Sequence, residues 1–269
     1  MDKSNLLRYK GYVKTPSLFL SQGSLSLNPI ELSSEFESLP KDVNFKNQRL
    51  GKLVEEFVFY QLKLQSNVKW LVENIQIQKE RTTIGELDAL YLLNNKPIHL
   101  EVVYKFYLYD SLKSYNNPLS YWIGPNRKDT LCYKIDKLKN KQFPLLFKSD
   151  TKQQLEPYNI DMTTISQSLC FKAQLFLPCN ETNIQFGSLN QNCVSGVYIS
   201  YLNLFKFKTL KFYKPQKLDW LVVPHNDVDW RDYDSAIMDI EKEIEVKRSP
   251  LVWIKHSNTK IVKCFVTFW

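Results

Sequence analysis

Two runs of alternating residues, 84–93 and 98–109, meet at the polar turn Asn94-Asn95-Lys96-Pro97. Side chains alternate across a strand, and turn residues separate the runs, so this pattern predicts a β-hairpin. Every second residue of the later run is apolar: Ile98, Leu100, Val102, Tyr104, Phe106 and Leu108. A strand face that is continuously apolar must be removed from water, so we expect this face to lie in the core.

The other face of the same hairpin carries charged and polar side chains. Glu86 and Asp88 share a face of the first run, and His99, Glu101 and Lys105 share a face of the second. Buried carboxylates must be paired or hold a metal, and converging carboxylate oxygens suit Mg²⁺. A nearby lysine would position or activate water for phosphodiester hydrolysis. The alternative is a solvated hairpin face crossed by ion pairs. His99 is interpreted as a surface residue or a support for the site, not as a ligand.

The remaining periodic segments predict a fold class. Helices are expected over 47–65, 127–143 and 235–248, and strands over 74–80, 169–177, 195–214, 250–257 and 259–269. Asn47 is the predicted N-cap of the first helix. This order favours an α/β or α+β fold around a mixed central sheet. Residues 1–46 are expected to form a lead-in segment with short ordered pieces. We expect 47–269 to form a single domain with an elaborated C-terminal half.

Charge and cysteine usage narrow the functional class. Lysine and arginine number 36 and acidic residues 28, and this excess of +8 hints at a polyanionic partner. The five cysteines form no C-x-x-C pair, which argues against a disulfide framework or a cysteine zinc site. No apolar stretch approaches the roughly 18 residues of a membrane span. We therefore expect a cytoplasmic protein that does not enter a membrane.

Five segments carry a resemblance to a known family. In order they are "LGKLVEEF", "IGELDAL", "HLEVVYKFYL", "WIGPNRKDTLCYKIDKLKNKQ" and "LDWLVVP". They resemble a bacterial family of unknown function, eighteen-fifty-three in the domain-of-unknown-function series, over about residues 47–224. That family is placed in the PD-(D/E)XK nuclease superfamily. A helix with Glu, a strand with Asp and a strand with Glu and Lys resemble the superfamily pattern. The resemblance implies a restriction-endonuclease-like core, with a mixed central sheet flanked by helices.

The resemblance also implies roles for four side chains. Asp88 matches the motif aspartate, Glu101 the acidic residue of the next strand, and Glu55 the glutamate that follows the family's "LG". Lys105 matches the motif lysine, but it lies four residues after Glu101, whereas the superfamily pattern places it two residues after. Asp88, Glu101 and Glu55 would then hold Mg²⁺ or Mn²⁺, and Lys105 would assist the attacking water. The displaced lysine makes a nuclease fold without cleavage the main alternative.

Helical geometry separates Glu55 from its neighbour Glu56. A helix advances about 100° per residue. Glu55 lies at the margin of the apolar face beside Gly51, which leaves room for a neighbour or an ion. Glu56 follows Lys52 by four residues, and we expect it in a solvated charged stripe. Glu55 is therefore the predicted site residue.

Two basic segments are candidates for nucleic-acid binding. Segment 127–148 is rich in lysine, and the resemblance implies that its helix lies beside the cleft. Segment 205–217 interleaves lysine with aromatic residues, a composition that can grip a backbone and stack bases. Solvated faces, or lysines that block edge pairing, are the alternatives. The candidate residues are Arg127, Lys128, Lys134, Gln142, Lys206 and Lys208.

These observations predict a nuclease that hydrolyses phosphodiester bonds of DNA with Mg²⁺ or Mn²⁺. The first alternative is an inactive protein of the nuclease fold that binds nucleic acid or a protein partner. The second alternative is a ribonuclease.

Overall fold

The computed structural model describes residues 3–19, 28–30, 32, 45–180 and 183–269. The strands are β1 (Asn28–Pro29), β2 (Val68–Lys79), β3 (Thr82–Leu93), β4 (Lys96–Tyr109), β5 (Trp122–Ile123), β6 (Ser166–Pro178), β7 (Val194–Ser200), β8 (Lys211–Tyr213), β9 (Leu251–Lys255) and β10 (Ile261–Thr267). The α-helices are α1 (Lys3–Lys14), α2 (Leu50–Lys63), α3 (Leu131–Lys137), α4 (Phe143–Leu145), α5 (Ser149–Leu155) and α6 (Tyr233–Glu245). The short helices are η2 (Pro118–Tyr121), the π-helical η3 (Leu138–Gln142), η4 (Glu156–Tyr158), η5 (Gln191–Cys193), η6 (Tyr201–Phe207) and η7 (Lys217–Leu221).

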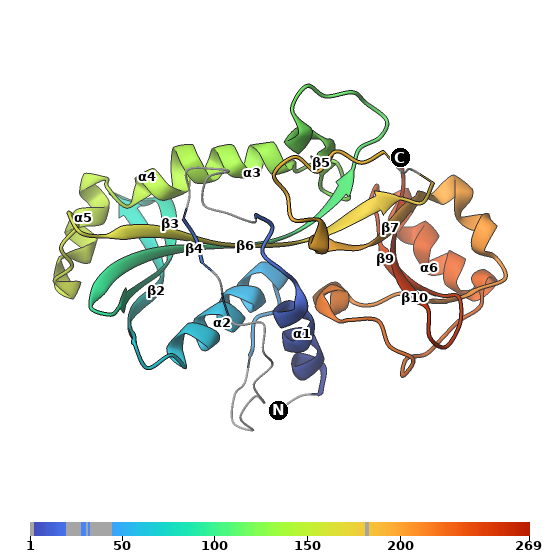
Figure 1. Cartoon of the computed structure of the whole chain (residues 1–269), viewed down its shortest axis with the longest axis horizontal. Helices are drawn as coiled ribbons and strands as arrows, with labels where there is room; N and C mark the ends of the chain where they lie inside the picture. Colours follow the sequence, from blue (N-terminus) through green and yellow to red (C-terminus); the bar gives the residue numbers. More distant parts are fainter. Residues whose placement is uncertain (1–2, 20–27, 31, 33–44, 181–182) are drawn as a thin grey trace.

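The described strands join in one mixed, ten-stranded sheet. Its main order is β2-β3-β4-β6-β7-β10-β9-β8, with β1 on β6 and β5 on β4. β2, β3 and β4 are antiparallel neighbours, whereas β4, β6, β7 and β10 run parallel in successive pairs. Helices flank the sheet (Figure 1). The expected α+β fold class with a mixed central sheet is confirmed.

The two faces of β4 belong to different core clusters. The alternating apolar residues from Ile98 to Leu108 pack in one cluster with α1 and α2, as expected. Val103 and Tyr107 pack in another cluster with the apolar side of α3. In Figure 1, α1 and α2 accordingly lie on one side of β4 and β6, and α3 to α5 lie on the other. Residues near the middle of β4 can therefore approach groups from both helical layers.

Helix α1 is an ordered piece of the lead-in segment 1–46. Lys3–Lys14 forms a helix of 12 residues. Tyr9 and Tyr12 are buried, and their rings lie 5.2 and 5.4 Å from the ring of Phe57 on α2. Much of the buried face of α1 consists of tyrosine, asparagine and glycine, so no strong apolar period marks it in the sequence.

Helix α1 also holds η7 in place. Gly11 packs directly on the backbone of Leu221, and a Cβ at position 11 would collide with the Leu221 carbonyl oxygen. Nearby, Nε of Arg8 donates a 2.7 Å hydrogen bond to Oδ1 of Asp219. The position of η7 relative to the sheet thus depends on a helix that lies far from it in the sequence.

Two predicted elements differ in their interior. The helix expected over 127–143 begins at Leu131, after Thr130 as its N-cap, and continues through η3 into α4. The strand or strands expected over 195–214 comprise β7, η6 and β8. Leu204 of η6 is buried among the C-terminal strands. The lysine-aromatic segment 205–217 runs from the end of η6 through β8 to the first residue of η7. None of the described helices is long and apolar enough to cross a membrane.

Candidate active site

The candidate site lies where β3 and β4 separate. The described pairing of these strands ends at Ala89 and Leu100. Asp88 and Glu101 are the next residues along each strand, so they occupy the fork. Oδ2 of Asp88 accepts a 2.8 Å hydrogen bond from the backbone N–H of Val102. This bond replaces a strand-to-strand contact and fixes one carboxylate at the fork.

Three carboxylates converge beside the fork. Ligand oxygens of Glu55, Glu86 and Asp88 all lie within 4.8 Å of one another. Lys52 donates hydrogen bonds to Oε2 of Glu55 at 2.5 Å, to Glu86, and to Oδ1 of Asn74 at 2.9 Å. Sequence reasoning left Glu86 out of the predicted site. The available signal was its position two residues before Asp88, on the same strand face.

Burial and crowding raise the pKa values of Asp88, Glu55 and Glu101. Burial, reinforced by Glu101, raises the pKa of Asp88 to about 7. Burial, reinforced by Asp88 and opposed by Lys52, raises the pKa of Glu55 to about 7. Burial also raises the pKa of Glu101 to about 8, although Lys134 opposes it. Full ionisation of this group is therefore unfavourable without further positive charge.

A hydrogen-bond network holds Glu101 from two sides. His99 lies 3.1 Å from Oε1 through Nε2, and Nε2 of Gln142 donates to Oε2. Nε2 of Gln167 lies 3.0 Å from Nδ1 of His99 and donates to it, so the imidazole proton resides on Nε2 and faces Glu101. Burial lowers the pKa of His99 to about 4, so the ring is neutral near pH 7. His99 is fully buried against Glu101, so the surface alternative is wrong.

Lys134 is the amine that joins this network. Its Nζ donates a 2.7 Å hydrogen bond to Oε1 of Gln142, whose amide donates to Glu101. Burial lowers the pKa of Lys134, and Glu101 is the main charge that opposes this shift. Lys105, the lysine expected beside the carboxylates, forms an ion pair with Asp129. The sequence predicted only nucleic-acid contacts for Lys134 and Gln142, because it does not show which face of α3 packs toward β4.

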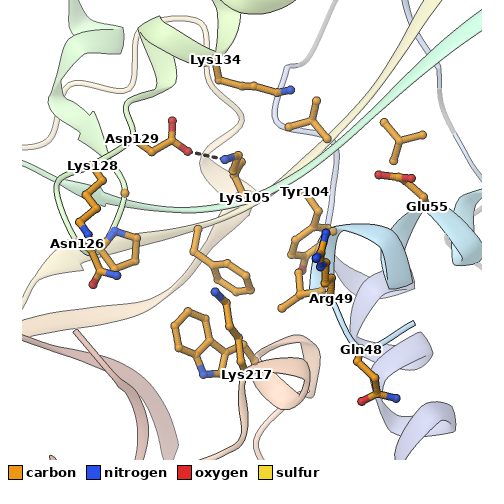
Figure 2. Close-up of a pocket in the computed structure, with 18 residues that line it drawn as sticks. Gln48, Arg49, Glu55, Tyr104, Lys105, Asn126, Lys128, Asp129, Lys134 and Lys217 are labelled. Atoms are coloured by element: carbon orange, nitrogen blue, oxygen red, sulfur yellow. Dashed lines mark hydrogen bonds and ion pairs between the residues drawn. The ribbon is translucent and has the colours of Figure 1, made fainter. Parts of the chain in front are cut away.

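A cavity of about 670 Å³ opens beside the fork. Its wall comes from the start of α2, the middle of β4, the loop 124–129, α3 and η7. Figure 2 shows Lys134 and Lys217 at opposite sides of the view, with Lys128 and Arg49 between them on either flank. Glu55 also belongs to the wall. The chain thus surrounds one cavity with cations from five segments and places the carboxylate cluster beside it.

The other candidates for nucleic-acid binding lie in different surroundings. Lys128 is exposed at the cavity wall. The guanidinium of Arg127 pairs with the buried Asp110 at 2.6 Å and lies 4.4 Å from the ring of Trp269. Lys206 and Lys208 are exposed on and after η6, and neither lines the cavity. The structure therefore brings Lys128, Lys134 and Gln142 to the site region and leaves the η6 lysines outside it.

The start of α2 differs from the predicted arrangement. The N-cap is Arg49 and not Asn47, and its side chain makes no capping bond. Nδ2 of Asn47 instead donates a 2.6 Å hydrogen bond to Oε1 of Glu56. Glu56 is half-buried, and Lys52 pairs with Glu55, so the expected solvated stripe is wrong. The predicted orientation of Glu55 toward Asp88 agrees with the structure.

Comparison with curated proteins and with solved structures finds no match. The profile of a protein family described as "Domain of unknown function (DUF1853)" matches residues 25–263. This match includes the helix, the three strands and the cavity wall described above. It covers far more than half of the 269 residues, so the chain belongs to the DUF1853 family.

Proposed function

We propose that the protein hydrolyses phosphodiester bonds of nucleic acid, with DNA as the expected substrate and a divalent metal as the cofactor. The observation that carries this proposal is the convergence of Glu55, Glu86 and Asp88 beside a cavity ringed by cations. The order of a Glu-bearing helix, an Asp-bearing strand and a Glu-bearing strand supports it, because this order resembles the PD-(D/E)XK nucleases.

The carboxylate cluster has the properties of a site for a hard cation. Its donors are carboxylate oxygens, which Mg²⁺ and Mn²⁺ prefer. Burial, reinforced by a neighbouring carboxylate, raises the pKa values of Glu55 and Asp88, and a cation would relieve that repulsion. Glu55, Glu86 and Asp88 would hold the ion, and Glu101, a further ligand implied by the resemblance, lies next to Asp88 at the fork. Such an ion supplies positive charge against the negative charge that develops on the phosphate.

The chain's own residues would orient the reactants. His99 and Gln142 each hold one oxygen of Glu101, which keeps this carboxylate in a single orientation. We assign to Lys134 the positioning of the attacking water, because its amine reaches the carboxylate network through Gln142. Lys105 was expected to do this, but its ion pair with Asp129 directs its amine to the cavity wall. A phosphate contact is the role that we propose for Lys105.

The direct test is cleavage of DNA with Mg²⁺ or Mn²⁺, compared with EDTA. Asp88→Ala should abolish cleavage because it removes a ligand from the cluster. Lys134→Ala should lower the rate by about a hundredfold, a usual effect for a group that acts on the attacking water. Lys137→Ala is the matched control, because Lys137 lies exposed on the same helix, and it should cut at the wild-type rate. Cleavage by Asp88→Ala at the wild-type rate would show that the proposed site is wrong.

Binding without cleavage is the second candidate, and one observation favours it. The ion pair with Asp129 holds Lys105 away from the role that the resemblance implies. If Lys134 does not compensate, the cavity would still bind nucleic acid, but no metal would restore cleavage. Binding that persists in EDTA, together with no product in Mg²⁺ or Mn²⁺, would favour this candidate.

A further inference from the structure

Asp88 and Glu101 lie too deep to be reached by a phosphate that stays on the surface. Asp88 is 7% exposed and Glu101 is 0% exposed. Glu55 is the member of the cluster that lines the cavity, together with Lys134. A phosphate must therefore enter the cavity to meet these groups, and the cavity wall determines what can accompany it.

Part of that wall is an unpaired strand edge. Pairing on this edge of β4 ends at Leu100 and resumes at Leu108 among the described strands. β4 keeps an unbroken register with β6 throughout, so its backbone alternates regularly. The N–H of Val102 points away from β6 and donates its hydrogen bond to Oδ2 of Asp88. By alternation, the N–H and C=O groups of Tyr104 and Phe106 point the same way and offer hydrogen bonds to the cavity.

An aromatic surface adjoins this edge. Trp220 of η7 lines the cavity and packs against Phe106 with ring centroids 5.4 Å apart and planes at 87°. Trp220 is half-buried, and Nζ of Lys217 lies 5.9 Å from its ring centroid. Bases stack readily on such rings, and each stacked base contributes about 1–3 kcal/mol to single-strand binding. The wall thus combines an aromatic surface with free backbone donors and acceptors.

Three cations at the cavity, the rim cations Arg49, Lys128 and Lys217, carry unbalanced charge. No carboxylate in the described part of the chain lies within ion-pair distance of any of them. In Figure 2 they approach the cavity from different sides. Their placement suits consecutive phosphates of a flexible strand that bends into the cavity.

We propose that this cavity admits one unpaired nucleotide, so that the site acts on single-stranded nucleic acid or on single-stranded ends. The phosphate would lie by Glu55 and Lys134, and the base would contact Trp220 and the free edge of β4. In a duplex the bases are stacked and paired, so their faces are not available to stack on an aromatic side chain. This inference rests on the proposed function for the identity of the reacting group, but the binding preference does not require cleavage.

The test is binding in EDTA, measured by fluorescence anisotropy. The probes are one labelled DNA strand of about 20 nucleotides, its blunt duplex, the duplex with a single-stranded overhang, and the RNA of the same sequence. We expect the single strand and the overhang to bind at least about tenfold more tightly than the blunt duplex at equal salt. The RNA arm reports whether the sugar is distinguished. Equal affinity for the blunt duplex and the single strand would overturn the inference.

A tryptophan variant locates the preference. Trp220→Leu should weaken single-strand binding by about tenfold and change blunt-duplex binding by less than about twofold, because only an unpaired base can stack on the ring. Trp230→Leu is the control, since Trp230 lies outside the cavity with Lys255 over its ring. Trp220→Phe keeps a ring and should retain most of the affinity. Unchanged blunt-duplex binding by Trp220→Leu would show that misfolding is not the cause of its weaker single-strand binding.

The outcomes separate the two proposals. A single-strand preference without metal-dependent cleavage would contradict the proposed hydrolysis but support the binding preference inferred here. Cleavage of a blunt duplex as fast as of a single strand would support the proposed hydrolysis and overturn the inferred preference for single strands. Equal weakening of both probes by Trp220→Leu, or none, would also overturn the assigned base contact.

Discussion

Replacement of Asp88 by asparagine should stabilise the metal-free protein at alkaline pH. Asparagine keeps an oxygen that can accept the 2.8 Å hydrogen bond from Val102, but it cannot ionise. Burial and the repulsion from Glu101 raise the pKa of Asp88 to about 7, against 3.8 for an exposed carboxyl. The folded protein therefore retains a proton that the unfolded chain releases, and its stability must fall as pH rises from about 4 to about 7.

The magnitude follows from this shift. A difference of about three pKa units corresponds to about 4 kcal/mol, at about 1.4 kcal/mol per unit. Protonation of a neighbouring carboxyl relieves part of the same repulsion, so we expect a gain of about 2–4 kcal/mol for Asp88→Asn at pH 8. Near pH 4 the side chain is uncharged in both folded proteins, and the two stabilities should agree. Asp136→Asn, on an exposed position of α3, should show no such pH dependence.

Urea unfolding in EDTA, followed by tryptophan fluorescence at several pH values, measures these differences. Addition of Mn²⁺ should reduce this difference at pH 8, because the ion stabilises the wild type by about 2.7 kcal/mol at a hundredfold excess over Kd and binds the variant weakly. Equal or lower stability of Asp88→Asn in EDTA at pH 8 would show that the carboxylates are not in mutual repulsion. The proposed cation site would then lose its physical basis.

Three further predictions test the site and the fold. Glu55→Gln should lower metal-dependent cleavage at least about tenfold across a Mg²⁺ titration, and Glu56→Gln less than about twofold, because only the former carboxylate adjoins the cluster; equal losses would mean that the helix orientation is wrong. Replacement of all three rim cations by glutamine should flatten the plot of log affinity against log salt by about 2 for single strands; an unchanged slope would exclude them as phosphate contacts. Gly11→Ala should destabilise the protein by at least about 2 kcal/mol in urea unfolding, because its Cβ meets the Leu221 carbonyl; a wild-type midpoint would show that η7 moves aside freely.

Local patterns in the sequence predicted the framework of the site. The alternation in β3 and β4 identified one of the two core faces of β4 and placed Asp88 and Glu101 near each other, because strand geometry has a fixed period of two. Helical periodicity likewise oriented Glu55 correctly within α2. These features depend on neighbours in the sequence or across one tight turn, so local rules suffice to find them.

The partners of the polar groups depend on long-range packing. Lys134, not Lys105, joins the carboxylate network, because the packing of α3 on β4 brings its amine to Gln142, while the loop before α3 brings Asp129 to Lys105. Arg127 likewise finds Asp110 and Trp269, which lie 17 residues before it and at the end of the chain. An ammonium or guanidinium on a flexible side chain can pair with any carboxylate within reach, so its position in the sequence does not identify its partner.

The cavity itself is a property of the assembled fold. Its wall joins α2, β4, the loop 124–129, α3 and η7, and η7 is held there by α1, a helix that carries no clear apolar period. Lysine-aromatic interleaving drew attention to segment 205–217, of which only Lys217 lines the cavity, whereas the aromatic residues that line it are Tyr104, Phe106 and Trp220. Composition can suggest that a chain binds nucleic acid. Which side chains share one enclosed space is set by how distant segments pack, and a local pattern carries no information about that packing.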